Sequence, residues 1–340
     1  MAKNMTSVLI ETTIRNTIRQ IKEDPERSIR NIVDMALHFA NGRFQQHFLS
    51  AAQNMLQNEN SSYYKLIPDL IHNIDEERII TFGMNVGYNS CTVGAQKIRD
   101  IESKEHYNIP WTISLELTGE QYIHYPYVYQ SLINQGRALG IYTWIIHSFG
   151  QISYLLELAD AFPDCAFPIF CSANELTGEV LDDAESIKNI MFIIPYSDQS
   201  EDIYKQLRAR NFLYSVSYPY SDIEPSHSDM DNVLRDIETL HSPFTIFLRR
   251  PYCTSKNNND LFYENILHTR MAQKYCSIPF DMIQDNLFID SIISDQACSI
   301  GFTQDGLCYS FKDGLLHEKY NLFDSSLTDI LKATVPRKNL

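Results

Sequence analysis

The sequence predicts an α/β protein in which parallel strands alternate with helices and curve into a partial or closed (β/α) barrel of the TIM type. Short apolar segments alternate with amphipathic segments seven times between Arg78 and Cys276. The apolar segments are nearly continuous, which is typical of parallel strands covered on both faces. Seven successive units are more than a doubly wound sheet commonly has, and no Pro/Gly-rich linker divides them, so a barrel is favoured.

The N-terminal segment, residues 1–76, is predicted to be helical. Ile14 and Ile18 belong to an apolar stripe with helical spacing. A second helix is expected to begin at Pro25, which fits a first helical turn, and to end at Gly42. A third helix follows over residues 43–56, before a polar loop.

The predicted barrel spans residues 77–285 and contains seven strands. Each strand is followed by an amphipathic helix, and this order implies right-handed crossovers between parallel neighbours. The predicted strands are RIITFGMN (78–85), PWTISLEL (110–117), IYTWIIHSF (141–149), AFPIFCSA (166–173), IMFIIPYS (190–197), FLYSVSYPY (212–220) and FTIFLRRPY (244–252).

The C-terminal segment, residues 286–340, breaks this alternation and is predicted to form a small hairpin-plus-helix extension. GFTQDGLCYSF predicts a hairpin whose turn contains Asp305 and Gly306. SSLTDIL predicts a short helix capped by Ser325 or Ser326.

Composition and charge exclude several classes of protein. The 340 residues are 44% hydrophobic and 21% charged, as in globular proteins. No apolar run approaches the roughly 20 residues that cross a bilayer, and the N-terminus lacks the apolar core of a signal peptide, so we expect a cytoplasmic protein without a membrane partner. A net charge of −15 argues against a nucleic-acid partner. The seven cysteines are widely spaced, which predicts neither a disulfide framework nor a metal site.

Polar residues follow the predicted strands, where parallel barrels carry their functional groups. Glu116 or His147 could act as a general base, because burial can move either pKa towards neutrality. Arg249 or Arg250 could clamp a carboxylate. The alternative is structural: polar strand ends face water in every barrel, and Glu116 could pair with Arg249. The predicted ring comprises Asn85, Tyr88, Glu116, Glu120, His147, Cys171, Asn174, Tyr196, Asp198, Tyr218, Asp222, Arg249 and Arg250.

Three segments resemble the radical S-adenosylmethionine superfamily, in particular its peptide-maturing members with a C-terminal extension of the SPASM or twitch type. GMNVGYNSCTVGA (83–95) occupies the place of the family's cluster loop. SLELTGEQ (114–121) is similar to its Gly-Gly-Glu motif, with Thr118 in place of the first glycine. ACSIGFTQDGLCYSF (297–311) and the helix after it resemble the extension. The resemblance implies S-adenosylmethionine near Gly119 and Glu120, and a cofactor loop containing Asn85, Tyr88 and Cys91.

The sequence departs from the family at the cluster ligands. The family's Cys-x3-Cys-x2-Cys pattern, aligned on Cys91, meets Met84 and Tyr88 at the other two positions. A [4Fe–4S] cluster needs three thiolates there. The expectation is therefore that no cluster binds, while S-adenosylmethionine stays possible.

Three functions remain open at this point. The first is a cluster-free pseudoenzyme whose barrel mouth binds a peptide or a homologous radical enzyme; the tyrosines of EQYIHYPYVYQ (120–130) suit peptide recognition. The second is a redox-independent enzyme for a small anionic substrate, with Glu116 or His147 as acid/base and Arg249 and Arg250 as anion clamp. The third is an active radical enzyme with atypical cluster ligands.

Overall fold

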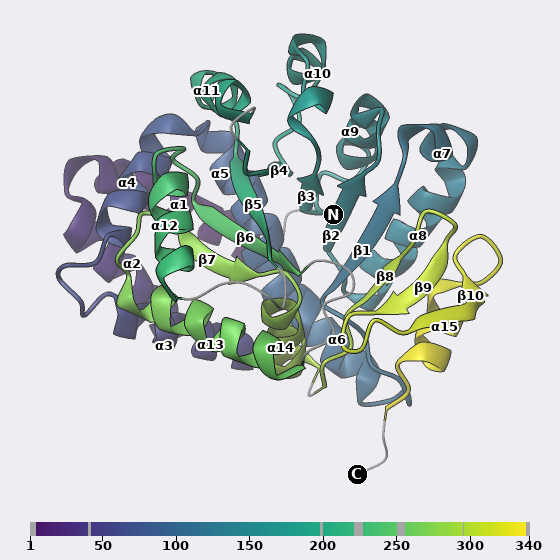
Figure 1. The fold of residues 1–340 in the computed structure, drawn as a ribbon. Helices are drawn as coiled ribbons and strands as arrows, with labels where there is room; N and C mark the ends of the chain where they lie inside the picture. Colours follow the sequence, from purple (N-terminus) through teal and green to yellow (C-terminus); the bar gives the residue numbers. More distant parts are fainter. Residues whose placement is uncertain are drawn as a thin grey trace.

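The computed structural model describes residues 5–39, 42–197, 200–220, 227–249, 256–294 and 296–337. The strands in these residues form one sheet (Figure 1). They are β1 (Thr112–Leu117), β2 (Thr143–Ser148), β3 (Phe167–Phe170), β4 (Ile190–Pro195), β5 (Tyr214–Tyr220), β6 (Phe244–Arg249), β7 (Ile278–Asp281), β8 (Ile300–Phe302), β9 (Leu307–Ser310) and β10 (Leu316–Asn321).

The strand order is β10-β9-β8-β1-β2-β3-β4-β5-β6-β7. Every pair from β8 through β1 to β7 is parallel, and β9 and β10 add antiparallel pairs. The prediction of an α/β partial barrel is confirmed, and among the described strands the sheet is open between β7 and β10. The three segment boundaries proposed from the sequence stay a prediction.

The helices cover the outside of the sheet and its amino-terminal end (Figure 1). None of the described helices is long and apolar enough to span a membrane. The helical elements are α1 (Met5–Glu23), α2 (Pro25–Phe39), α3 (Arg43–Met55), α4 (Tyr63–Asn73), α5 (Glu76–Gly83), the π-helix η1 (Met84–Gly94), α6 (Ala95–Glu102), α7 (Gly119–His124), α8 (Pro126–Leu139), α9 (Ile152–Asp160), the 3-10 helix η2 (Ala173–Glu175), α10 (Gly178–Asp183), α11 (Glu201–Ala209), α12 (His227–Glu238), α13 (Lys256–Ala272), α14 (Gln284–Ile293) and α15 (Leu327–Thr334).

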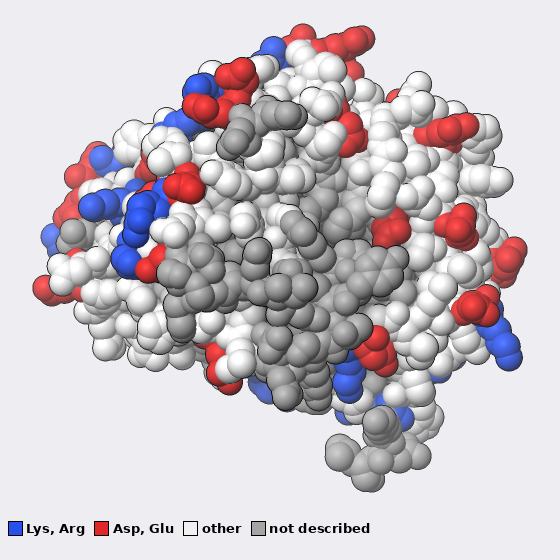
Figure 2. Space-filling view, viewed as in Figure 1, with Lys and Arg blue, Asp and Glu red and all other residues white. Residues whose placement is uncertain are grey.

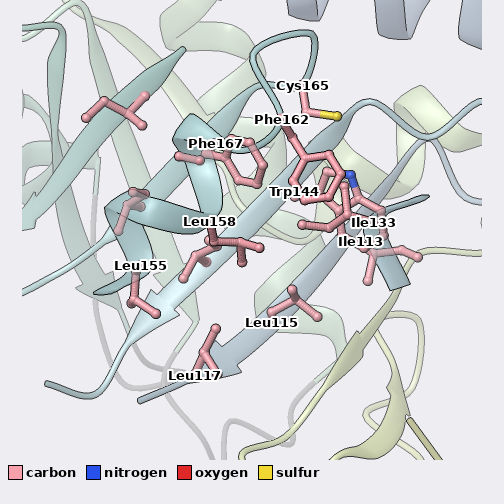
Figure 3. Packing of buried hydrophobic residues seen from close by; sticks show 14 of the residues in the cluster. Ile113, Leu115, Leu117, Ile133, Trp144, Leu155, Leu158, Phe162, Cys165 and Phe167 are labelled. Carbon is pink, nitrogen blue, oxygen red and sulfur yellow. The ribbon is translucent and has the colours of Figure 1, made fainter. Parts of the chain in front are cut away.

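The two faces of the sheet carry separate apolar clusters. On the helix-covered face, Ile113, Leu115, Trp144 and Phe167 pack against residues of α8 and α9 (Figure 3). Complete burial of one such side chain stabilises the fold by about 1.5–3 kcal/mol. On the opposite face, Ile145 on β2 belongs to the same cluster as residues of β3, β4 and β6, Leu213 just before β5, and Phe311 just after β9. Side chains from strands this far apart in the strand order can contact one another only if the sheet is curved. This second face is therefore concave.

One prediction was wrong: residues 78–85 form helix rather than a strand. The Asp75 side chain accepts a hydrogen bond from the Arg78 amide, and Glu76 and Glu77 occupy the first turn, which is a helix-start signal. From there α5, η1 and α6 follow one another without an intervening loop.

This helical stretch crosses the amino-terminal ends of four strands in succession. Arg78 donates to the backbone carbonyls of Ala184 and Ile187, which precede β4. Asn85 donates to the carbonyls of Pro163 and Cys165, before β3. The Ser90 hydroxyl then meets that of Thr143 at the start of β2, and the Glu102 carboxylate accepts the Ile109 amide before β1. Residues 76–102, named here the floor helix, therefore close the amino-terminal end of the sheet.

The C-terminal hairpin and helix are confirmed. β8 and β9 are antiparallel, with Gly306 at φ +77° in the connection. Only glycine adopts this conformation without strain, and a Cβ there would also meet the ring of Phe323. Ser326 caps α15 by accepting the Asp329 amide. β8 pairs with β1, so the hairpin continues the main sheet.

Candidate functional site

The carboxyl ends of β1 and β2 bring two predicted site residues together. Glu116 and His147 are direct partners in the parallel register. Both lie on the concave face, since His147 is two residues beyond Ile145 on the same strand. Both side chains are partly buried, and neither makes a hydrogen bond or ion pair in the described part of the chain. Two ionisable groups are thus free to meet a ligand.

Burial favours the uncharged form of both groups. It raises the pKa of Glu116 above its ordinary value. It lowers the pKa of His147 to about 4, so the imidazole is neutral at pH 7. The His147 ring stacks on Phe170, with 4.6 Å between ring centroids and 8° between planes. This stacking fixes the orientation of a neutral imidazole that can accept a proton or a hydrogen bond.

Two further residues on the concave face were not predicted. Tyr309 on β9 lies opposite Gly301, where any Cβ would come within 2.3 Å of the tyrosine ring. The requirement for glycine opposite an aromatic residue is the signal that could have found it. Ser217 on β5 is 1% exposed, and its hydroxyl has no hydrogen-bond partner among the described residues. A buried, unpaired hydroxyl is costly unless a ligand or water completes it.

Arg249 does not lie with Glu116 and His147. Its register partner is Tyr220, and Phe247, two residues earlier, packs in a helix-side cluster with Phe262. Arg249 therefore projects from the opposite face of the sheet, and four strands lie between β1 and its own strand, β6. The predicted structural pair of Glu116 with Arg249 is not formed, and Arg249 does not complete an anion clamp beside Glu116.

The remaining members of the predicted ring have separate surroundings. Cys171 is buried, which raises the pKa of its thiol far above the usual range. Asn174 is exposed on η2. Tyr196 and Tyr218 approach each other, with ring centroids 6.3 Å apart. Asp198, Asp222 and Arg250 lie outside the described residues.

Gly119 and Glu120 lie at the carboxyl end of β1, as predicted. Thr118 caps α7 by accepting the Gln121 amide. The Gly119 amide donates to the Gly150 carbonyl at 2.9 Å, and a Cβ on Gly119 would lie 2.3 Å from the Gln151 carbonyl oxygen. The glycine therefore allows α7 to approach the segment before α9. Glu120 is exposed.

Asn85, Tyr88 and Cys91 lie at the other end of the sheet, on the floor helix. The side-chain amide of Asn85 donates both of its hydrogen bonds to backbone carbonyls. Cys91 is 6% exposed, and burial raises the pKa of its thiol to about 12. The structure therefore does not bring these residues together with Gly119 and Glu120.

The residues of the floor helix do not fit a [4Fe–4S] cluster. The cluster needs three thiolates on an adaptable segment, whereas Met84, Tyr88 and Cys91 lie in a continuous helix and the one thiol is buried and protonated. In the part of the chain that the structure describes, no three His, Cys, Asp or Glu side chains are grouped to hold a metal ion.

No family model matches the sequence, and no curated protein matches it. Among solved structures, the chain is similar to SuiB of Streptococcus suis, whose crystal structures include complexes with S-adenosylmethionine and with the precursor peptide SuiA. The TM-scores are 0.48 for the first complex and 0.49 for the second, at 8% and 9% sequence identity. The match covers 69% of this chain and 66% to 68% of SuiB, so the chain spans about two thirds of its length.

At this identity and these TM-scores, the likeness reports a similarity of fold alone. It assigns neither an activity nor a ligand to this chain.

Proposed function

We propose that this protein is a peptide-binding component of a peptide-maturation system, with its binding site at the carboxyl edge of β1 and β2 and without an iron–sulfur cluster at residues 84–91. The observation that carries this proposal is the floor helix. Cys91 is buried there, at the end of the sheet opposite Gly119 and Glu120. The chemical groups left for a ligand are those of the carboxyl edge.

These groups suit a peptide. The neutral imidazole of His147 and the Glu116 carboxyl can exchange hydrogen bonds with backbone amides and carbonyls. The hydroxyl of Ser217, which has no hydrogen-bond partner among the described residues, offers another such group on the same face. Phe170 supplies apolar surface beneath His147. Should S-adenosylmethionine bind, we propose that Gly119 and Glu120 would hold it, since an exposed carboxylate such as that of Glu120 can accept hydrogen bonds from an amino group.

A redox-independent enzyme is the second candidate, because Glu116 and His147 are direct register partners. Burial raises the pKa of the Glu116 carboxyl and lowers that of the His147 imidazole, so each can carry or accept a proton without a permanent charge. Arg249 does not lie beside this pair, so it does not supply the anion clamp in that case. This function requires that the protein turn over a small anionic substrate. The rate of that turnover should fall in both Glu116→Gln and His147→Gln.

The proposed function is tested by selecting binders to the immobilised protein from a random peptide library. The selected peptides are then titrated against the double variant Glu116→Ala with His147→Ala. We expect their affinity to fall by about tenfold or more, because two groups that contact the ligand are removed.

Glu105→Ala with His106→Ala provides the matched control, since this adjacent Glu–His pair is exposed on the segment that precedes β1. It should bind like the wild type. Recovery of no peptide, or equal affinity of both double variants, would overturn the proposal. Circular dichroism of each variant checks that it is folded.

A further inference from the structure

Large apolar side chains are exposed beside the carboxyl edge. Ile123, Tyr125, Tyr127, Phe149 and Tyr154 are 38% to 83% exposed, and together they are named here the α7–α9 surface. They come from α7, the start of α8, the end of β2 and α9, which are packed together: the Gly119 amide bonds to the Gly150 carbonyl, and α7 contacts α9. Aromatic groups concentrated at one place are typical of a surface that binds a partner.

The same part of the chain is strongly acidic. Residues 116–187 contain ten Asp or Glu residues and a single Lys or Arg, Arg137. That cation already pairs with Asp164, with 2.5 Å between nitrogen and oxygen. In Figure 2, acidic groups are scattered over the side where Figure 1 places α7 and α9, while basic groups gather mainly on the opposite side.

On both α7 and α9, an exposed carboxylate lies three residues from an exposed apolar side chain. Glu157 lies three residues after Tyr154 on α9, and Glu120 lies three residues before Ile123 on α7; all four are exposed. Residues three apart on a helix are neighbours. A cationic side chain on a ligand can therefore contact the Glu157 carboxylate and the Tyr154 ring at once, while Glu120 offers a carboxylate beside the apolar Ile123.

We propose that the α7–α9 surface docks a cationic peptide that also carries apolar or aromatic side chains. This inference rests on the proposed function and specifies its ligand class. Charge complementarity selects the occupant: a second copy of this chain, with a net charge of −15, would be repelled. The field of the carboxylates steers a cationic peptide to the surface, and burial of the aromatic rings holds it there.

The surface leads directly to the candidate site. Phe149 is two residues beyond His147 on the chain, and Glu120 is four beyond Glu116. One end of a peptide bound to the α7–α9 surface thus lies within a few residues of both side chains, since an extended chain advances about 3.3 Å per residue.

The test uses three fluorescein-labelled peptides: GRFGRFGRFGRF, GQFGQFGQFGQF and GEFGEFGEFGEF. Fluorescence anisotropy measures their affinity for the full chain at low and high salt. We expect the arginine peptide to bind tightest and to weaken with salt. Glu120→Gln with Glu157→Gln should weaken it by about tenfold or more, and Tyr127→Ser with Phe149→Ser by a similar factor.

Matched controls lie on other elements. Glu59→Gln with Glu264→Gln changes the net charge by the same amount, and Leu261→Ser with Met271→Ser removes exposed apolar groups from α13. Both should bind within twofold of the wild type. Equal losses in control and surface variants would overturn the inference, because they would reveal a general charge or solubility effect.

The variant Glu116→Ala with His147→Ala separates the two proposals. If the arginine peptide binds and its affinity falls only in this variant, the proposed function stands and the docking role of the α7–α9 surface is overturned. Tighter binding of the glutamine or glutamate peptide likewise overturns the docking surface. If only the surface variants weaken binding, the docking surface stands and the role of Glu116 and His147 fails. Failure of the arginine peptide to bind would overturn the docking surface, whereas the peptide library decides on the proposed function.

Discussion

Replacing Gly94 by alanine is expected to destabilise the protein by about 1–3 kcal/mol, whereas Gly87→Ala should stabilise it by about 0.5–1 kcal/mol. A Cβ at Gly94 would lie 2.2 Å from the Gly140 carbonyl oxygen and 2.8 Å from that of Asn89, so backbone would have to move. A Cβ at Gly87 meets nothing within 4 Å. There alanine gains helix propensity at no steric cost.

Urea unfolding of the two variants and the wild type measures both effects. The comparison distinguishes a floor helix from a cofactor loop, since a loop that needs conformational freedom at Gly87 would lose stability on substitution. Destabilisation by Gly87→Ala, or indifference to Gly94→Ala, would contradict the helical packing described here.

Arg78→Ala is expected to destabilise the protein by about 3 kcal/mol or more. Arg78 is 1% exposed and donates three hydrogen bonds, to the carbonyls of Ala184, Glu185 and Ile187, at 2.6 to 3.0 Å. Its guanidinium lies 4.0 Å from the centroid of the Phe212 ring. Removal leaves buried carbonyls at the end of α10 without donors and opens a cavity under β4.

The variants Arg78→Met and Arg235→Ala complete this experiment. Methionine restores much of the volume without the donors, so a large loss in Arg78→Met as well assigns the effect to the hydrogen bonds. Arg235 is exposed on α12, and Arg235→Ala should change the unfolding free energy by no more than about 0.5 kcal/mol. Equal stabilities of Arg78→Ala and Arg235→Ala would show that Arg78 does not anchor the floor helix.

Much of the fold could be predicted because buried parallel strands are long apolar segments. β1 to β6 correspond to six predicted strands. Residues 78–85 were wrongly predicted to be a strand because their apolar run is short, and a short run fits either a strand or a buried helix. The acidic residues after Asp75 carried the correct signal. β7 and β10 were missed, since β7 is four residues long with Pro279 inside it and β10 is largely polar and exposed.

Part of the candidate site could also be predicted from the sequence. Glu116 and His147 were found because parallel strands end at one edge. The face of Arg249 was misjudged, since every second residue of a strand points the other way and the register with β5 decides which. The pairing of Gly301 with Tyr309 in the predicted hairpin could have pointed to Tyr309. Its place in the main sheet depends on the pairing of β8 with β1, which no local pattern reveals.

Hydrogen–deuterium exchange with and without the arginine peptide tests most directly where the protein works. The central claim is that the carboxyl edge binds the ligand while the floor helix is structural. It predicts slower amide exchange in residues 119–127 and 147–157 when the peptide is bound, and unchanged exchange in residues 84–94. Protection that appears in residues 84–94 and not at the carboxyl edge would contradict it.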